Sequence, residues 1–234
     1  MAVTILHPQW GESRPVQGVL FDMDGLVLDS EILYSRFWRE ACGFYGYDMS
    51  YQQSLRMRAL NRQLAQKTLA EFFGPGIDYD TVRNKRIELM NAFIEKNGVP
   101  VKPGIYQLME YLKRNGIASA ITSSSPIERI QNHLSRHGLA DAFDKLCSGH
   151  DVPRGKPEPD IYLHGAASLG LDPKNCLALE DSATGILSAY RAGCLPVMIP
   201  DLDQPDDQTK ELLFAQADTL ADIIALIEQQ NARL

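Results

Sequence analysis

Short apolar runs alternate with amphipathic stretches along most of the chain. Each apolar run is bounded by Gly, Pro, Asn, Asp or Ser, which is typical of buried strands. Each amphipathic stretch repeats its apolar positions every three or four residues, which is typical of helices that pack on a sheet. The runs at 16–21, 117–122, 145–147, 176–179 and 195–199 predict strands, and the stretches at 104–115, 126–137, 159–169 and 182–192 predict helices. This alternation predicts an α/β fold with a doubly wound parallel sheet.

The segment between the first predicted strand and the others has a different, helical pattern. Apolar residues recur at helical spacing from Leu33 to Cys42, over 55–73 and over 79–96. Since one strand precedes this block and the other strands follow it, the block is an insertion. We therefore expect an all-helical domain over 32–102, a core made of 15–31 and 103–234, and an N-terminal extension over 1–14. A capping box formed by Thr219 and Asp222 is expected to begin the last helix.

Composition narrows the class of protein. The 234 residues are 44% hydrophobic and 23% charged, as in ordinary globular proteins, and the net charge of −7 argues against a nucleic-acid binder. The four cysteines are scattered, which favours reduced thiols over a zinc site or a disulfide framework. The sequence lacks an apolar run of membrane-spanning length and a signal-peptide segment. We therefore expect a cytoplasmic monomer or weak dimer without nucleic-acid or membrane partners.

Two carboxylates follow the first predicted strand, at Asp22 and Asp24. Their spacing of two residues would place both on one face of an extended chain. Two unpaired carboxylates there would repel each other and lose solvation, so the pattern suggests a bound cation. The position, beyond the carboxyl end of a strand, is also where open α/β sheets bind ligands. An acidic turn without any ligand is the simpler alternative.

Three later strand ends carry further polar groups. Ser123, Ser124 and Ser125 precede a predicted helix, where hydroxyl and backbone N–H groups can bind an anion or simply cap the helix. Lys156 lies in a loop that is stiffened by two prolines, although surface loops of this composition are frequent. Glu180 and Asp181 end another buried strand, where a metal site is favoured over a solvated face.

The predicted fold brings these four sites to one edge of the sheet. Carboxylates from two strands would hold a hard divalent cation, which we expect to be Mg²⁺. The hydroxyl groups and the ammonium group would complete a pocket of the size of a phosphate group. This combination predicts a phosphoryl-transfer site that acts by positioning and charge neutralisation.

The same residues carry a resemblance to a known family. The chain resembles the haloacid dehalogenase superfamily over residues 16–234, in the branch of β-phosphoglucomutases and small sugar-phosphate phosphatases. The motifs that match are Phe-Asp-Met-Asp-Gly at 21–25, Ser123, Lys156 in Gly-Lys-Pro-Glu-Pro-Asp, and Glu180-Asp181. The resemblance implies a Rossmann-like core with an inserted helical cap domain that closes over a small phosphorylated metabolite.

The resemblance also implies roles for the site residues. Asp22 would be the nucleophile that forms an aspartyl-phosphate, and Asp24 the general acid and base. Asp22, the Asp24 backbone carbonyl and Asp181 would ligate Mg²⁺, with Glu180 holding a metal-bound water. Lys156 would neutralise the anionic reactants. Ser123, counted among the catalytic residues, and the Ser124 backbone would bind the phosphate oxygens, and Ser125 would be a further substrate-binding residue.

Residues of the helical segment distinguish a phosphatase from a mutase, which moves a phosphate group within a sugar. Tyr34 stands where the mutases carry a histidine, and tyrosine is a poor proton shuttle near neutral pH. We therefore expect a phosphatase, with a hexose-phosphate mutase and a non-catalytic binding protein as the alternatives. Tyr34 could equally be a packing residue. Arg62 lies near the substrate-contacting cap loop of this branch and is a candidate substrate ligand or an exposed helix residue.

Overall fold

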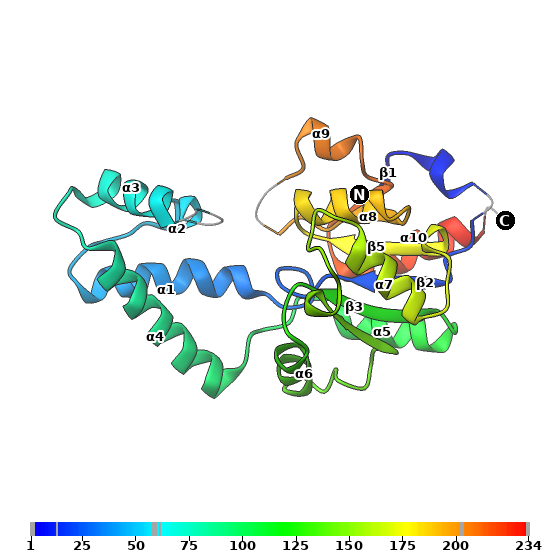
Figure 1. Cartoon of the computed structure of the whole chain (residues 1–234), viewed down its shortest axis with the longest axis horizontal. Coiled ribbons are helices and arrows are strands. Elements are labelled where there is room, and N and C mark those ends of the chain that lie inside the picture. Colours follow the sequence, from blue (N-terminus) through cyan, green and yellow to red (C-terminus); the bar gives the residue numbers. More distant parts are fainter. Residues whose placement is uncertain (1–2, 13, 58–59, 61, 202–203, 233–234) are drawn as a thin grey trace. The chain divides into compact units, whose positions relative to one another are not determined.

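The structure is a computed structural model that describes residues 3–12, 14–57, 60, 62–201 and 204–232. The chain divides into two compact units (Figure 1). One unit, the core, comprises Met1–Leu28 and Val101–Leu234. The other, the helical unit, is the inserted segment Asp29–Pro100.

The core contains a seven-stranded sheet in the order β1-β7-β6-β5-β2-β3-β4. All neighbouring pairs are parallel except β1 and β7, so the predicted doubly wound α/β fold is confirmed. The central strand β2 pairs Phe21 with Leu179 on one side and with Ile121 on the other. The strands are β1 Val3–Ile5, β2 Gly18–Phe21, β3 Ala118–Ser123, β4 Lys145–Ser148, β5 Cys176–Glu180, β6 Leu195–Met198 and β7 Ala215–Ala217.

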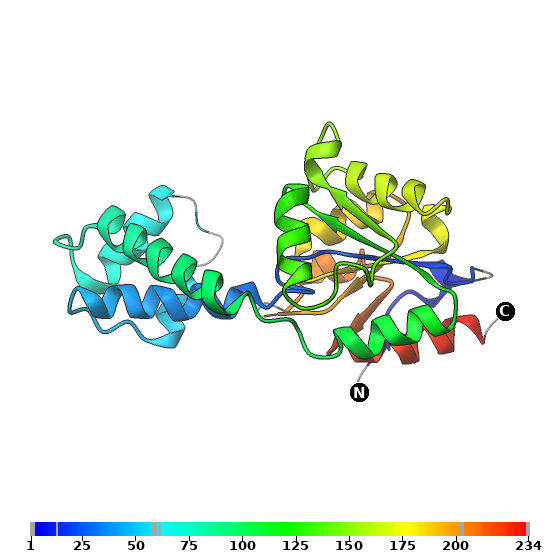
Figure 2. The ribbon, with the colours of Figure 1, turned by 90° about the horizontal axis from the view of Figure 1, so that it is seen from below.

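Helices cover both faces of this sheet. Helices α7 and α8 pack on one face, whereas α5 and α10 lie side by side on the other (Figure 2). Strands β2 and β5 are consequently buried along their whole length, as expected for central parallel strands. The helices of the core are α5 Ile105–Arg114, α6 Ile127–Ser135, α7 Asp160–Ser168, α8 Ala183–Arg191, α9 Asp207–Lys210 and α10 Ile223–Asn231. Four short 3₁₀ segments are η1 Pro8–Gly11, η2 Gly149–Asp151, η3 Pro173–Asn175 and η4 Leu220–Asp222.

The ends of the core chain differ in part from the sequence expectation. Val3–Ile5, which we set aside as part of an extension, form the antiparallel edge strand β1. Strand β7 was not predicted either, since its three residues are too few to show a pattern. The Asp222 carboxylate accepts a hydrogen bond from the Thr219 N–H at 2.8 Å, so the expected contact at the start of the last helix is present.

The described residues of the helical unit form four helices around their own apolar core. They are α1 Ser30–Phe44, α2 Tyr51–Arg56, α3 Arg62–Phe73 and α4 Tyr79–Asn97. The stretch over 55–73 that we expected to be one helix therefore belongs to two helices, α2 and α3. Ser50 is the N-cap residue of α2, and its hydroxyl accepts a hydrogen bond from the Gln53 N–H. None of the helices in the described part of the chain has the length and hydropathy needed to cross a membrane.

Candidate active site

A tight turn after β2 positions the first two carboxylates. The Asp22 N–H donates to the Leu179 carbonyl at 3.0 Å, which continues the pairing of β2 with β5 by one residue. The chain then turns back, and the N–H groups of Val27 and Leu28 both donate to the Met23 carbonyl. Asp22 is buried and Asp24 is half-buried. The backbone thus places both carboxylates at the carboxyl edge of the sheet, as predicted.

Lys156 lies inside this cluster of carboxylates. Its Nζ is 2.5 Å from Asp22 Oδ1 and 2.6 Å from Glu180 Oε1, although the three residues come from different parts of the chain. Only 9% of the Lys156 side chain is exposed. A buried ammonium group with two carboxylate partners is fixed in position, and this contact joins the loop after β4 to the ends of β2 and β5.

Glu180 has further partners that the sequence did not reveal. Its Oε1 also accepts a hydrogen bond from the Tyr162 hydroxyl at 2.6 Å, and its Oε2 accepts one from the Ser182 hydroxyl at 3.1 Å. Tyr162 belongs to α7 and is fully buried. These contacts orient Glu180, which in turn orients Lys156 toward Asp22. No local sequence signal could have identified Tyr162, because it lies on a helix face that reads as ordinary core.

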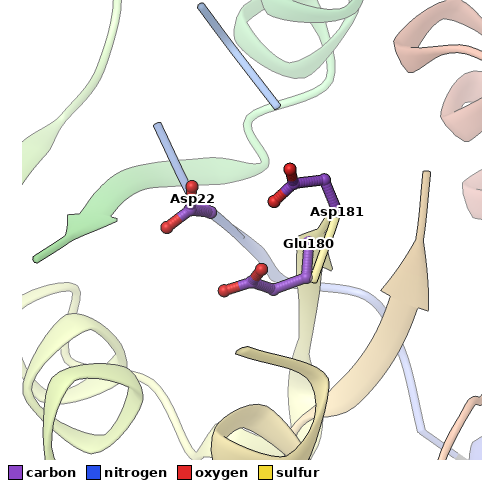
Figure 3. Close-up of side chains that lie close together, drawn as sticks. All are labelled: Asp22, Glu180 and Asp181. Carbon is purple, nitrogen blue, oxygen red and sulfur yellow. The ribbon is translucent and has the colours of Figure 1, made fainter. Parts of the chain in front are cut away.

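Asp181 completes a group of three acidic side chains. Carboxylate oxygens of Asp22, Glu180 and Asp181 lie within 4.8 Å of one another, and Figure 3 shows the three side chains converging. Asp181 lies directly against Gly25, where a β-carbon would overlap its carboxylate. Gly25 also has a φ of +92°, which favours glycine. The missing side chain at Gly25 therefore leaves the space that Asp181 occupies.

This donor set suits a divalent cation. The cluster has three carboxylates and one ammonium group, so its fully ionised form carries an excess of negative charge that a cation would offset. Hard oxygen ligands at this spacing are what Mg²⁺ prefers in proteins. Of the residues that were predicted to hold Mg²⁺, Asp22, Glu180 and Asp181 form a cluster that fits such an ion, and their binding of Mg²⁺ stays a prediction.

Burial shifts the ionisation of these groups strongly. Burial, reinforced by the Glu180 carboxylate, raises the pKa of Asp22 to about 7 although Lys156 opposes the shift. Burial likewise raises the pKa of Asp181 to about 8, and the neighbouring carboxylates add to the effect. Burial acts against the charged form of Lys156, but Asp22 and Glu180 outweigh it and raise its pKa. The carboxylates thus ionise with difficulty until a cation compensates them.

We predict a specific pH dependence of stability in the absence of a divalent cation. The unfolded chain releases the protons of Asp22 and Asp181 near pH 4, whereas the folded chain holds them up to about pH 7 and 8. Folding stability therefore falls as the pH rises between these limits. The melting temperature in EDTA is expected to be several degrees lower at pH 8 than at pH 6.5, at about 2–4 °C per kcal/mol.

Differential scanning calorimetry with EDTA or Mg²⁺ checks this prediction. Mg²⁺ is expected to raise the melting temperature more at pH 8 than at pH 6.5, because it binds the ionised carboxylates. The variant Asp181→Asn is the matched control and should show a smaller pH dependence and a smaller response to Mg²⁺. A cation-free melting temperature that rises over this pH range would contradict the assignment.

One of the predicted serines, Ser125, contacts Asp24. The Ser125 hydroxyl donates to Asp24 Oδ2 at 3.1 Å, and Arg129 Nη2 lies 3.4 Å from Asp24 Oδ1. The Ser123 hydroxyl oxygen accepts a hydrogen bond from the Ser125 N–H at 3.1 Å, and Ser124 is exposed. The serines thus lie at the end of β3, next to β2. Arg129, in the first turn of α6, was missed because a single arginine on a helix carries no signal of its own.

Tyr34 and Arg62 belong to the helical unit. The Arg86 guanidinium lies over the Tyr34 ring, 4.7 Å from its centroid. Arg86 is buried, and burial lowers its pKa. Arg62 is exposed and forms an ion pair with Asp80 at 2.5 Å, so it is an exposed helix residue, one of the two expectations for it. Their contact with a substrate stays a prediction.

Comparison with known proteins places the chain in a family. The family model of haloacid dehalogenase-like hydrolases matches residues 16–193. The chain belongs to this family. It is therefore an enzyme of the hydrolase class, and the resemblance inferred from its motifs is confirmed.

Relatives of this haloacid dehalogenase-like hydrolase include several phosphatases. Hexitol phosphatase B of Escherichia coli (strain K12) is 29% identical over 214 residues, which cover 91% of this chain and 96% of the relative. Hexitol phosphatase A of the same strain is 31% identical over 199 residues, covering 81% and 88%. A probable pseudouridine-5'-phosphatase of Drosophila melanogaster is 30% identical over 194 residues, covering 80% and 83%.

Solved structures show the same fold. A family hydrolase from Deinococcus radiodurans R1, with bound phosphate and sodium, has a TM-score of 0.82 at 25% identity and covers 94% of this chain and 98% of its own. A putative β-phosphoglucomutase from Thermotoga maritima has a TM-score of 0.75 at 23% identity, covering 91% and 99%. The hydrolase thus shares its architecture with proteins named for hydrolysis and for mutase activity.

Proposed function

We propose that the chain is a Mg²⁺-dependent phosphatase that hydrolyses a small phosphorylated metabolite through an aspartyl-phosphate. The observation that carries the proposal is the buried contact of Lys156 with Asp22 inside a group of three carboxylates. A structural ion pair would not need a second and a third carboxylate at the same place. Such a cluster is suited to neutralising a phosphate ester and its nucleophile together.

In the first half of the reaction a carboxylate oxygen of Asp22 attacks the phosphorus atom of the ester. The new P–O bond forms as the bond to the leaving oxygen breaks, and Asp24 donates a proton to that oxygen, which leaves as an alcohol. Lys156 keeps Asp22 oriented and offsets the negative charge that both reactants bring together. The serines at the end of β3 supply hydroxyl and backbone N–H donors for the phosphate oxygens.

In the second half a water molecule attacks the phosphorus atom of the aspartyl-phosphate. Asp24, now ionised, accepts a proton from this water, and the P–O bond to Asp22 breaks to release inorganic phosphate. The free carboxylate of Asp22 is regenerated. Support for both roles of Asp24 comes from Ser125 and Arg129, which contact its two oxygens, and from its side chain, which stays partly open to solvent.

The proposed cation site would use groups from the turn after β2 and from the end of β5. Asp22, Asp181 and the backbone carbonyl of Asp24 would hold Mg²⁺, and Glu180 would support them from its buried position. When bound, the ion supplies positive charge to the oxygens of the nucleophile and the phosphate. The open space at Gly25 leaves Asp181 free to reach this position.

The substrate is proposed to be a phosphorylated sugar or polyol. The support comes from the names of the hexitol phosphatases, which the chain matches over nearly its whole length. Tyr34 weighs against the mutase alternative, because it stacks against Arg86 and offers no imidazole for proton transfer. A mutase must also protect its phospho-enzyme from water, which a phosphatase does not need.

A panel of phosphate esters tests this proposal. The purified chain is expected to release inorganic phosphate from at least one hexose, hexitol or nucleoside monophosphate in Mg²⁺, and to lose this activity in EDTA. Each reaction is followed in parallel for isomerised sugar phosphate by NMR. Isomerisation without free phosphate would replace the proposal by a mutase, and no turnover of any ester would favour a binding protein.

A further inference from the structure

A half-buried ion pair lies beside the candidate active site. Lys102 Nζ is 2.5 Å from Asp201 Oδ1, and the two side chains are only 19% and 9% exposed. The Lys102 N–H donates to the Val27 carbonyl at 2.9 Å, so Lys102 is attached to the turn that follows Asp24. Asp201 follows β6, the neighbour of β5. The pair therefore connects the turn that follows Asp22, the candidate nucleophile, to the segment after β6.

The surroundings of Asp201 are unusual for a structural ion pair. Its Oδ2 is fully buried and has no hydrogen-bond partner among the residues that the structure describes. A cavity of about 200 Å³ lies here, lined by Gly25 and Leu26 as well as by both members of the pair. Burying a carboxylate with one oxygen unsatisfied costs free energy that a single ammonium partner does not fully return. A gain in stability alone does not explain the arrangement.

Gly25 connects this pair to the cation site. Gly25 lies against the Asp181 carboxylate, and it also lines the cavity that Lys102 and Asp201 share. On the other flank, the Ile199 N–H donates to the Glu180 carbonyl at 2.8 Å, so the segment leading to Asp201 follows the end of β5. The ion pair thus links the turn that lies against Asp181 to the segment that runs alongside the end of β5.

We propose that Lys102 and Asp201 are a positioning pair for the divalent cation: by linking the turn at 24–27 to the segment after β6, they hold Gly25 against Asp181 and so keep the Asp181 carboxylate in the orientation that the ion needs. This inference rests on the proposed function, because it assumes that the acidic cluster binds Mg²⁺. Neither residue contacts the reacting atoms. Both act through the turn, as supporting residues around metal ligands commonly do.

Titration calorimetry with Mg²⁺ tests the positioning pair without using catalysis. The variants Asp201→Asn and Lys102→Gln are each expected to weaken Mg²⁺ binding by about tenfold, the lower end of the range for such supporting residues. The double variant should be no worse than either single one, because one contact is lost in all three. Lys102→Arg keeps the ion pair and should recover most of the affinity. Phosphatase assays should show a higher Mg²⁺ requirement with little change in kcat at saturating Mg²⁺.

A control variant and the stability of each protein separate the possible outcomes. Asp218→Asn changes an exposed residue that lines the same cavity, and it should bind Mg²⁺ like the wild type. Unchanged Mg²⁺ affinity in Asp201→Asn, with a lower urea midpoint, would overturn the inference and leave a purely structural pair. Tighter binding in Lys102→Gln would also overturn it, since charge rather than position would then dominate. Lack of Mg²⁺ binding by the wild type would refute the proposed function itself.

Discussion

Replacing Asp22 by asparagine is expected to abolish phosphate release, by about 10³-fold or more, while the protein stays folded. The amide is nearly isosteric with the carboxylate and can still accept a hydrogen bond from Lys156. It is a far weaker nucleophile, however, and it removes one negative charge from the proposed cation site. The loss therefore follows from the chemistry of the first step rather than from a change of fold.

Steady-state release of phosphate, measured beside circular dichroism and urea unfolding, checks this expectation. The matched control is Asp141→Asn, which makes the same change at an exposed surface position of the core unit. It should keep the activity of the wild type. The covalent step is tested by acid quenching with a ³²P-labelled ester: the wild type should retain label and Asp22→Asn should not. Activity of Asp22→Asn within tenfold of the wild type would rule out nucleophilic catalysis by this residue.

The sequence predicted the edge of the sheet where the site lies because parallel strands impose it. Once 16–21 and 176–179 are identified as buried parallel strands, Asp22 and Asp181 must emerge at the same edge. The loop position of Lys156 followed less directly, from the resemblance of its motif. The contact of Lys156 with Asp22 confirms that these distant segments meet in one site.

Contacts that depend on side-chain direction could not be predicted in this way. Arg129 contacts Asp24, which lies more than a hundred residues away in the chain, and Tyr162 contacts Glu180 at the end of strand β5. Both are helical residues, and helical periodicity alone does not identify such partners. The half-buried pair of Lys102 and Asp201 was missed for the same reason. Edge strand β1 forms through backbone pairing with β7, and its three residues are too few to show an alternation of apolar and polar positions.

Replacing Lys156 by methionine is expected to damage stability and activity together. The variant leaves Asp22 and Glu180 buried without the ammonium group that each contacts. Removing one partner of a buried ion pair costs about 3–5 kcal/mol, because the remaining charge is neither solvated nor paired. Activity should fall by at least about 10²-fold, since the positive charge that offsets the nucleophile and the phosphate is lost.

The loss of stability in Lys156→Met comes from unbalanced buried charge, so a second substitution that removes a charge should reverse part of it. In Lys156→Met, Asp22 loses the ammonium group that lowers its pKa most, so this pKa rises further. The loss of folding stability should therefore be smaller at pH 6.5 than at pH 8. Adding Glu180→Gln removes one uncompensated carboxylate and should restore part of the urea midpoint at pH 8 without restoring turnover. The single change Glu180→Gln serves as the reference for that comparison. If Lys156→Met unfolds at the wild-type urea concentration at pH 8, the ammonium group is not balancing the buried carboxylates, and both the cation site and the mechanism built on that balance lose their support.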